Sequence, residues 1–191
     1  MKSIIEPMLT IADLDATPDD GNRYELIEGE IYMSRSPSLT HQQVVHNLDV
    51  DLGLYLRNNP IGVLVPGAGI VFDDFNGVIP DLLFVSNERW AEVASGERLS
   101  GPPDLVIEVL SPGAENERRD RNLKKKVYGR FGVKEYWIVD PVNRAIEVYS
   151  LRKRGMDLIA TFSGDQLVKS AVLPGLTMKV SDAFKLHVPQ A

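Results

Sequence analysis

The sequence of 191 residues contains no cysteine. This absence excludes disulfide bonds, thiolate zinc sites and cysteine nucleophiles, and it is compatible with a reducing compartment. At the N-terminus, Glu6 and Pro7 come before an apolar stretch of signal-peptide length can form. The longest apolar stretch, residues 61–72, contains Pro66 and three glycines and is too short to span a bilayer. We therefore expect a cytoplasmic protein without a membrane segment.

Histidine is also scarce, since only His41, His46 and His187 are present. Three histidines spread along the chain do not suggest a multi-histidine metal site. The sequence also lacks the Gly-x-Ser-x-Gly motif of serine hydrolases and the glycine spacing of nucleotide-binding loops. These absences argue against zinc-dependent, serine-hydrolase and nucleotide-binding functions.

The composition is that of a folded protein, with 43% hydrophobic and 25% charged residues. A chain of this length buries roughly 70% of the surface that it exposes when unfolded. No internal repeat, low-complexity tract or linker divides the sequence. We expect a single domain over residues 1–191.

The net charge of −6 hides a strong asymmetry between the two parts of the chain. Residues 1–110 contain 6 basic and 18 acidic side chains, whereas residues 111–191 contain 15 basic and 9 acidic ones. Eight of the basic residues lie between Arg118 and Lys134. A basic element beside an acidic body suits a protein that contacts phosphates along one edge. A solvated helix face is an equally good interpretation of the same run.

The pattern of apolar residues predicts helices that alternate with groups of strands. A capping-box pattern at Thr40 starts the first helix, which stops at residues 58–60, and a second helix covers residues 116–130. The predicted strands are residues 24–33, 61–65, 69–72, 78–85, 105–110, 135–139, 145–151 and 158–162. The last two strands form a C-terminal β-hairpin. Together these elements predict an α/β (α+β) fold with one mixed central β-sheet flanked by helices.

Two carboxylates interrupt strands that are otherwise apolar. Asp81 lies within residues 78–85, and Glu108 lies within residues 105–110. Burial of an ionised carboxylate without a partner is costly, so both positions require an explanation. One explanation is that each acid faces solvent or an arginine at a strand end. For a pair on neighbouring strands we favour a shared Mg²⁺ or Mn²⁺, because these cations prefer hard oxygen ligands.

These carboxylates and their surroundings resemble a known family. Pro80-Asp81 followed by Glu108 resembles the bipartite PD-(D/E)XK nuclease motif. The neighbouring blocks resemble the Uma family of restriction endonuclease-like proteins over residues 9–186; they are Tyr24-Glu25-Leu26-Ile27-Glu28-Gly29-Glu30, His41, Pro103-Asp104-Leu105-Val106-Ile107-Glu108-Val109-Leu110-Ser111-Pro112, Asp120 with Lys124 and Tyr128, and Gly132-Val133-Lys134-Glu135-Tyr136-Trp137-Ile138-Val139-Asp140-Pro141. The resemblance implies a restriction endonuclease-like core and a Mg²⁺-dependent endonuclease that hydrolyses DNA, with Mn²⁺ as the other candidate metal.

The sequence departs from the superfamily motif at Leu110, where a lysine is expected. The resemblance places that lysine at Lys124, in the following helix. Asp120, Lys124 and Tyr128 are spaced four residues apart and therefore share one helix face. A lysine in a basic helix can also be simply solvated, which is the alternative interpretation.

The resemblance assigns a role to each candidate site residue. It implies that Asp81 and Glu108 bind the metal and that these two residues and Lys124 are catalytic. It implies an accessory role for four further residues, namely Glu25, His41, Asp120 and Tyr128. Without the resemblance, His41 is more simply a boundary residue on an apolar helix face.

Two functional hypotheses follow. The first is a metal-dependent endonuclease, and the second is a catalytically inactive protein of the same fold that binds nucleic acid or supports assembly. The acidic pair favours the first hypothesis, because a protein that only binds an anionic ligand gains little from two buried acids. Cleavage of both strands of a duplex requires two active sites, so we also expect a homodimer.

Overall fold

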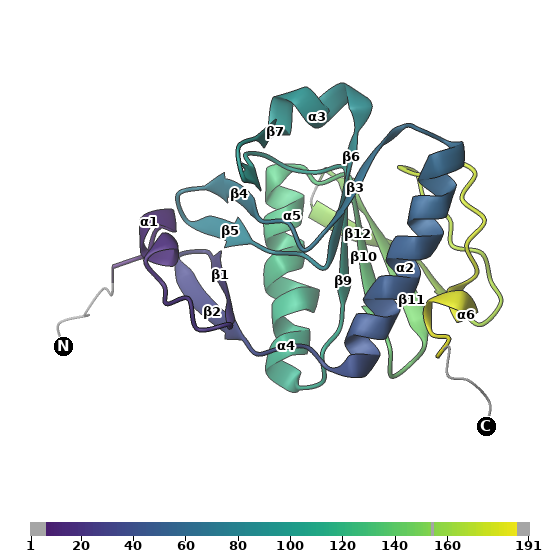
Figure 1. The fold of residues 1–191 in the computed structure, drawn as a ribbon, viewed down its shortest axis with the longest axis horizontal. Coiled ribbons are helices and arrows are strands. Elements are labelled where there is room, and N and C mark those ends of the chain that lie inside the picture. Colours follow the sequence, from purple (N-terminus) through teal and green to yellow (C-terminus); the bar gives the residue numbers. More distant parts are fainter. Residues whose placement is uncertain (1–6, 154, 187–191) are drawn as a thin grey trace.

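The computed structural model describes residues 7–153 and 155–186 and contains two mixed β-sheets of six strands each, packed with helices (Figure 1). The strands of the central sheet, in spatial order, are β12 (Gly155–Ser163), β11 (Ala145–Arg152), β10 (Glu135–Asp140), β9 (Leu105–Val109), β6 (Leu82–Ser86) and β3 (Gly62–Pro66). Those of the smaller sheet are β2 (Glu30–Ser34), β1 (Arg23–Ile27), β5 (Asn76–Val78), β4 (Ile70–Asp73), β8 (Arg98–Leu99) and β7 (Ala94–Ser95). The helical elements are α1 (Ile11–Asp15), α2 (Leu39–Asn58), α3 (Asn87–Val93), α4 (Ala114–Arg118), the π-helical turn η1 (Arg119–Lys124), α5 (Lys125–Phe131) and α6 (Val180–Ala183).

The predicted central sheet with flanking helices and a C-terminal hairpin is confirmed. Strands β9 and β10 are parallel, and the other neighbours in this sheet are antiparallel. Helix α2 packs Leu48 and Leu52 against one face of the sheet, whereas α5 packs Val127 and Tyr128 against the other (Figure 1). Because both faces are covered, β9 and β10 are buried along their whole length, as their apolar sequences predict.

The prediction of one sheet misses the smaller sheet, whose strands are only two to five residues long. Residues 24–33 form the β1–β2 hairpin rather than one bent strand. The chain reverses at Glu28 and Gly29, which have positive φ angles of 51° and 79°. Runs this short carry too few residues for a clear alternation of apolar and polar side chains.

The predicted strand over residues 78–85 is interrupted in the structure. Strand β5 ends at Val78 in the smaller sheet, and β6 begins at Leu82 in the central sheet. Pro80 lies between them, and it has no backbone N–H to contribute to a sheet. Asp81 therefore lies immediately before β6, where the chain passes from one sheet to the other.

The helix boundaries also differ from the prediction. Helix α2 begins at Leu39, because the Ser38 hydroxyl accepts a hydrogen bond from the His41 amide at 3.2 Å; the predicted cap at Thr40 is wrong. The predicted helix over residues 116–130 is longer, since α4, η1 and α5 follow one another without a break. It ends as predicted at Gly132, which adopts the left-handed conformation.

None of the helices in the described part of the chain is both long and apolar enough to cross a membrane.

Candidate active site

Asp81 and Glu108 project from the same face of the central sheet. Strands β6 and β9 are antiparallel, and Leu82 lies opposite Ile107, so continuation of this register places Asp81 opposite Glu108. Residues that are opposite each other in neighbouring strands point to the same side. This is the side of Leu83, which packs in the same buried cluster as Val127 and Tyr128 of α5. The two predicted carboxylates are therefore neighbours beneath the helix that carries Lys124.

A cavity of about 520 Å³ opens over these carboxylates, and we call it the acidic cavity. Six of the seven predicted site residues line it, and residues 33–38, which lead into α2, form one wall. The six are Glu25, His41, Asp81, Glu108, Asp120 and Lys124.

Lys124 is almost completely enclosed, with only 2% of its surface exposed. Its ammonium nitrogen Nζ lies 2.9 Å from Glu108 Oε1 and 2.8 Å from Glu25 Oε1. Asp120 Oδ1 lies further away, at 3.8 Å. Burial alone would lower the pKa of Lys124, but the charges of these three acids together raise it. The side chain is consequently a positive ammonium group at neutral pH, not a solvated lysine.

The π-helical turn explains why the side chains of Asp120, Lys124 and Tyr128 point to the same side of the helix. Residues four apart on an α-helix rotate gradually around its axis. A π turn contains an extra residue and turns the next residues back. Asp120 and Lys124 lie within η1, and Tyr128 follows in α5. The Tyr128 hydroxyl donates a 2.7 Å hydrogen bond to Glu108 Oε1, so the predicted shared helix face is confirmed.

Glu108 retains one oxygen for a ligand. Its Oε1 accepts hydrogen bonds from Lys124 and Tyr128, whereas Oε2 accepts none from the described residues. Burial, which is the largest influence, together with the nearby Asp120 and Asp81 raises the pKa of Glu108 to about 8, against the opposing effect of Lys124. Burial and the neighbouring acids thus oppose the ionisation of Glu108 when no cation is bound beside it.

Asp81 is held from two sides. Its Oδ1 lies 3.1 Å from His41 Nε2, and its Oδ2 accepts a 2.8 Å hydrogen bond from the Val109 amide. Burial would raise the pKa of Asp81, but His41 and the Val109 amide lower it below the ordinary value. With a proton on Nε2, His41 donates to Asp81 Oδ1, and the Ser111 hydroxyl lies 3.4 Å from His41 Nδ1. His41 is thus a buried hydrogen-bond partner of Asp81.

Glu25 and Asp120 complete the set of acids. Glu25 is 1% exposed, and its Oε1 accepts a 2.8 Å hydrogen bond from the Ile79 amide, which fixes the segment before Asp81. Asp120 lies 3.4 Å from Arg119, and burial raises its pKa although Lys124 and Arg119 act against this.

The sequence patterns do not single out Arg119 and Arg23, two of the three arginines that line the acidic cavity. Arg119 donates a 2.8 Å hydrogen bond to the Ser34 hydroxyl, and Arg23 lies 3.6 Å from Asp81 Oδ1. Arg119 is hidden in sequence within the basic run, and Arg23 precedes the Tyr24-Glu25 block. Only the fold shows that both guanidinium groups reach the acids.

Most of the basic run is paired with acids of the protein itself. Arg121 bonds Glu147 at 2.7 Å, Lys126 bonds Glu28 at 2.8 Å, and Lys134 pairs with Asp104. The acids in these contacts come from residues 1–110 and from residues 111–191, and they offset the positive charge of the helix. The helix is therefore neither a uniformly solvated face nor an unpaired track for phosphates.

The donor set of the acidic cavity suits a hard divalent cation. Asp81 and Glu108 offer carboxylate oxygens from neighbouring strands, and Glu108 Oε2 has no competing donor among the described residues. Within residues 7–153 and 155–186, no group of three or more histidine, aspartate or glutamate side chains is arranged to hold a metal; His187 lies outside these ranges. The site thus offers two side-chain ligands, and Mg²⁺ commonly retains several waters in such a site.

Comparison with known proteins agrees with this architecture. The family model described as "Uma2: Putative restriction endonuclease" matches residues 11–181. A crystal structure described as a putative nuclease belonging to DUF820 from Anabaena variabilis ATCC 29413 superposes with a TM-score of 0.74 at 19% identity, covering 92% of this chain and 97% of that one. The type IIG restriction endonuclease BpuSI gives a TM-score of 0.44 at 12% identity, covering 79% of this chain and 16% of the larger protein. The comparison with curated proteins gave no match.

Proposed function

The chain belongs to the Uma2 family of restriction endonuclease-like proteins, and from this premise we propose that it is a metal-dependent endonuclease that hydrolyses DNA phosphodiester bonds in the acidic cavity. The observation that carries the proposal is the pairing of Asp81 and Glu108 on one sheet face beside the Lys124 ammonium. Lys124 replaces the lysine that the superfamily motif places two residues after the glutamate.

Asp81 and Glu108 would hold Mg²⁺ or Mn²⁺ through their free lone pairs. A metal bound there would polarise the phosphoryl oxygen and lower the pKa of a bound water. His41 and the Val109 amide fix the orientation of Asp81, and Tyr128 does the same for Glu108. The carboxylates are consequently held in place before substrate arrives, which is what efficient catalysis requires.

Lys124 would act as a cation and hydrogen-bond donor. Because its neighbours raise its pKa, it does not take a proton from water at neutral pH. An ammonium group at this position stabilises the additional negative charge of the phosphoryl transition state. Arg119 and Arg23, at the edges of the cavity, are suited to contact the phosphates on either side.

A cleavage assay tests the proposal directly. Supercoiled, linear duplex and single-stranded DNA are each incubated with the purified protein in Mg²⁺, Mn²⁺ or EDTA. We expect cleavage of at least one form in the metal-containing samples and intact DNA in EDTA. Cleavage that persists in EDTA would contradict metal dependence. DNA that is bound but remains intact under every metal condition would favour the inactive, binding-only alternative.

We further propose that the protein is a homodimer. Strand β12 is the edge of the central sheet, and it exposes half of the surface of Leu158 and Ile159. An edge strand with apolar side chains is a ready surface for a second copy. Sedimentation at micromolar concentration without DNA should give the mass of a dimer, and substitution of Ile159 by Lys should shift the population toward the monomer. A monomeric wild-type protein would contradict this proposal.

A further inference from the structure

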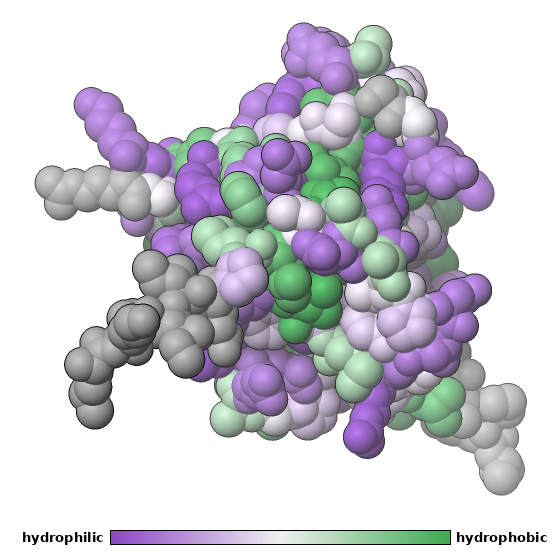
Figure 2. Space-filling model, turned by 90° about the vertical axis from the view of Figure 1, so that its left-hand side faces the viewer, coloured by the Kyte–Doolittle hydropathy of each residue, from purple (hydrophilic) through white to green (hydrophobic). Residues whose placement is uncertain are grey.

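A second cavity adjoins the acidic cavity. It has a volume of about 620 Å³ and lies between α1, the start of β1 and the strands β4 and β5; we call it the flanking cavity. Gly21, Arg23 and Ile79 line both cavities, so the two lie next to each other. Figure 2 shows the end of the molecule formed by α1 and the smaller sheet, where apolar surface is bordered by hydrophilic residues.

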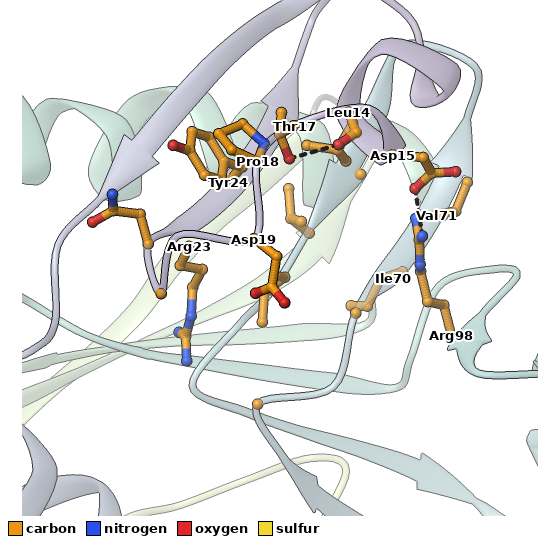
Figure 3. A pocket seen from close by; sticks show the side chains of 17 residues that line it. Leu14, Asp15, Thr17, Pro18, Asp19, Arg23, Tyr24, Ile70, Val71 and Arg98 are labelled. Carbon is orange, nitrogen blue, oxygen red and sulfur yellow. Dashed lines mark hydrogen bonds and ion pairs between the residues drawn. The ribbon is translucent and has the colours of Figure 1, made fainter.

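The walls of the flanking cavity combine an apolar base with polar edges. Ile70 and Val71 come from β4, and the ion pair between Arg98 and Asp15 lies on one side (Figure 3). Its volume is in the range of small-molecule sites, which are largely apolar with a few placed polar groups. A nucleobase has this chemistry, because it is flat and apolar on its faces and carries hydrogen-bonding groups at its edge.

Arg23 lines both cavities, and its guanidinium makes no hydrogen bond to another described residue. Its Nη1 lies 3.6 Å from Asp81 Oδ1, which is too long for a hydrogen bond. Its guanidinium donates no hydrogen bond within the described ranges 7–153 and 155–186, although it has five N–H groups. An arginine of this kind can bind a phosphate with two parallel hydrogen bonds. A DNA strand that enters the acidic cavity would place a phosphate here.

Asp19 offers an unused acceptor in the flanking cavity. Figure 3 shows its carboxylate directed to the same side as the Arg23 guanidinium. Asp15 is paired with Arg98, and Asp20 accepts hydrogen bonds from Asn22 and Tyr24. No hydrogen bond or ion pair joins Asp19 to any other described residue. Its ionised carboxylate can only accept hydrogen bonds, so it selects for a ligand edge that donates them.

We propose that the flanking cavity binds one unpaired base of the DNA strand, next to the phosphate held by Arg23, and that Asp19 selects bases with an exocyclic amino group. This inference rests on the proposed nuclease function and specifies its substrate. Cytosine, adenine and guanine have such amino groups, whereas the single N3–H donor of an unpaired thymine is flanked by two carbonyl oxygens that repel a carboxylate. The base must be unpaired, because in a duplex its amino edge is engaged in base pairing and its faces are stacked.

The test compares the binding of eight-nucleotide oligomers of dC and of dT, labelled with fluorescein, in CaCl₂ by fluorescence anisotropy. The integrity of each oligomer is checked on a gel. We expect wild-type protein to bind the dC oligomer about tenfold more tightly, since the dT oligomer lacks the amino group that donates a charge-assisted hydrogen bond to Asp19. In Asp19→Asn the preference should fall below about twofold, because the amide can donate to the thymine oxygen. Asp157→Asn, which changes an exposed carboxylate on β12, is the matched control and should keep the preference.

A second pair of variants separates the phosphate contact from base selection. Arg23→Gln should weaken the binding of both oligomers about tenfold without changing their ratio, whereas Arg57→Gln at the exposed end of α2 should change neither. Circular dichroism confirms that each variant is folded. Equal binding of dC and dT by the wild type, or an unchanged preference in Asp19→Asn, would overturn the inference. The base preference and the effect of Arg23→Gln on affinity are both measured without cleavage. A failure of the nuclease proposal is therefore detected separately, as DNA that stays intact in Mg²⁺.

Discussion

Glu108→Gln and Asp81→Asn should each lose DNA cleavage by about a thousandfold or more while remaining folded. A metal that acts as a Lewis acid supplies several kcal/mol of transition-state stabilisation, and each 1.36 kcal/mol corresponds to a tenfold change in rate. Glutamine at position 108 still presents an acceptor oxygen, so the hydrogen bonds that Lys124 and Tyr128 donate to this side chain can persist. Initial rates of cleavage in Mg²⁺, with the melting temperature measured alongside, give both quantities.

Metal binding gives a second readout for the same pair of residues. Titration calorimetry with Mg²⁺ or Mn²⁺ should show weak binding to the wild type, because two carboxylates make an incomplete coordination shell. The signal should disappear in the Asp81→Asn, Glu108→Gln double variant.

Glu147→Gln provides the matched control for this double variant. It removes one negative charge outside the acidic cavity, on β11, where Glu147 pairs with Arg121, and should leave both metal binding and cleavage intact. Metal that binds equally well to the double variant would refute the assignment.

The sequence is informative about this site where a residue contradicts its local surroundings. Asp81 and Glu108 stand out because an acid in an apolar strand is costly, and Lys124 because its helix positions it with Asp120 and Tyr128. The structure places all of them together. Arg23 and Asp19 do not stand out, because an arginine or an aspartate in a polar segment is ordinary. Their proposed importance comes from cavities whose walls are formed by segments distant in sequence.

The same distinction applies to the fold. Strands β9 and β10 are predicted because they are apolar apart from Glu108 and the terminal acids of β10, and because they are bounded by prolines or glycine. The break between β5 and β6 is not predicted, because residues 78–85 read as one apolar run apart from Pro80 and Asp81. What separates them is pairing with two different sheets, and pairing partners are not encoded in a local pattern. The ion pairs of the basic helix are likewise not predicted, since its acidic partners outside the helix lie on other strands and loops.

Lys124→Met should reduce cleavage by about a hundredfold to a thousandfold, which is the cost of removing one preorganised donor from a transition state. Methionine nearly preserves the shape of the side chain but removes the positive charge. The variant should also be less stable, because Glu25 and Glu108 would lose their shared cation while remaining buried. Loss of one partner of a buried ion pair costs about 3–5 kcal/mol, and a protein of this size loses about 2–4 °C in melting temperature for each kcal/mol.

A double variant separates catalysis from stability. Lys124→Met combined with Glu25→Gln removes one negative charge together with the positive one, so the melting temperature should recover by several degrees while cleavage stays low. Lys125→Ala and Lys126→Ala are the neighbouring controls. Lys125 lies over the Tyr149 ring, 4.8 Å from its centre, and Lys126 pairs with Glu28 at the surface. Neither reaches the acidic cavity, because successive residues on a helix point in different directions.

These controls should retain turnover at saturating DNA, and each should lower the salt dependence of binding by about one counterion at most. Lys124→Met should do the reverse, with nearly unchanged DNA affinity and a large loss of turnover, because its contribution is made in the transition state. Turnover and affinity are therefore measured for all the variants across one salt series. If the three single variants lose activity in proportion to affinity, Lys124 acts only as part of a basic surface. If the double variant regains cleavage together with its stability, the lysine serves the fold and the catalytic assignment fails.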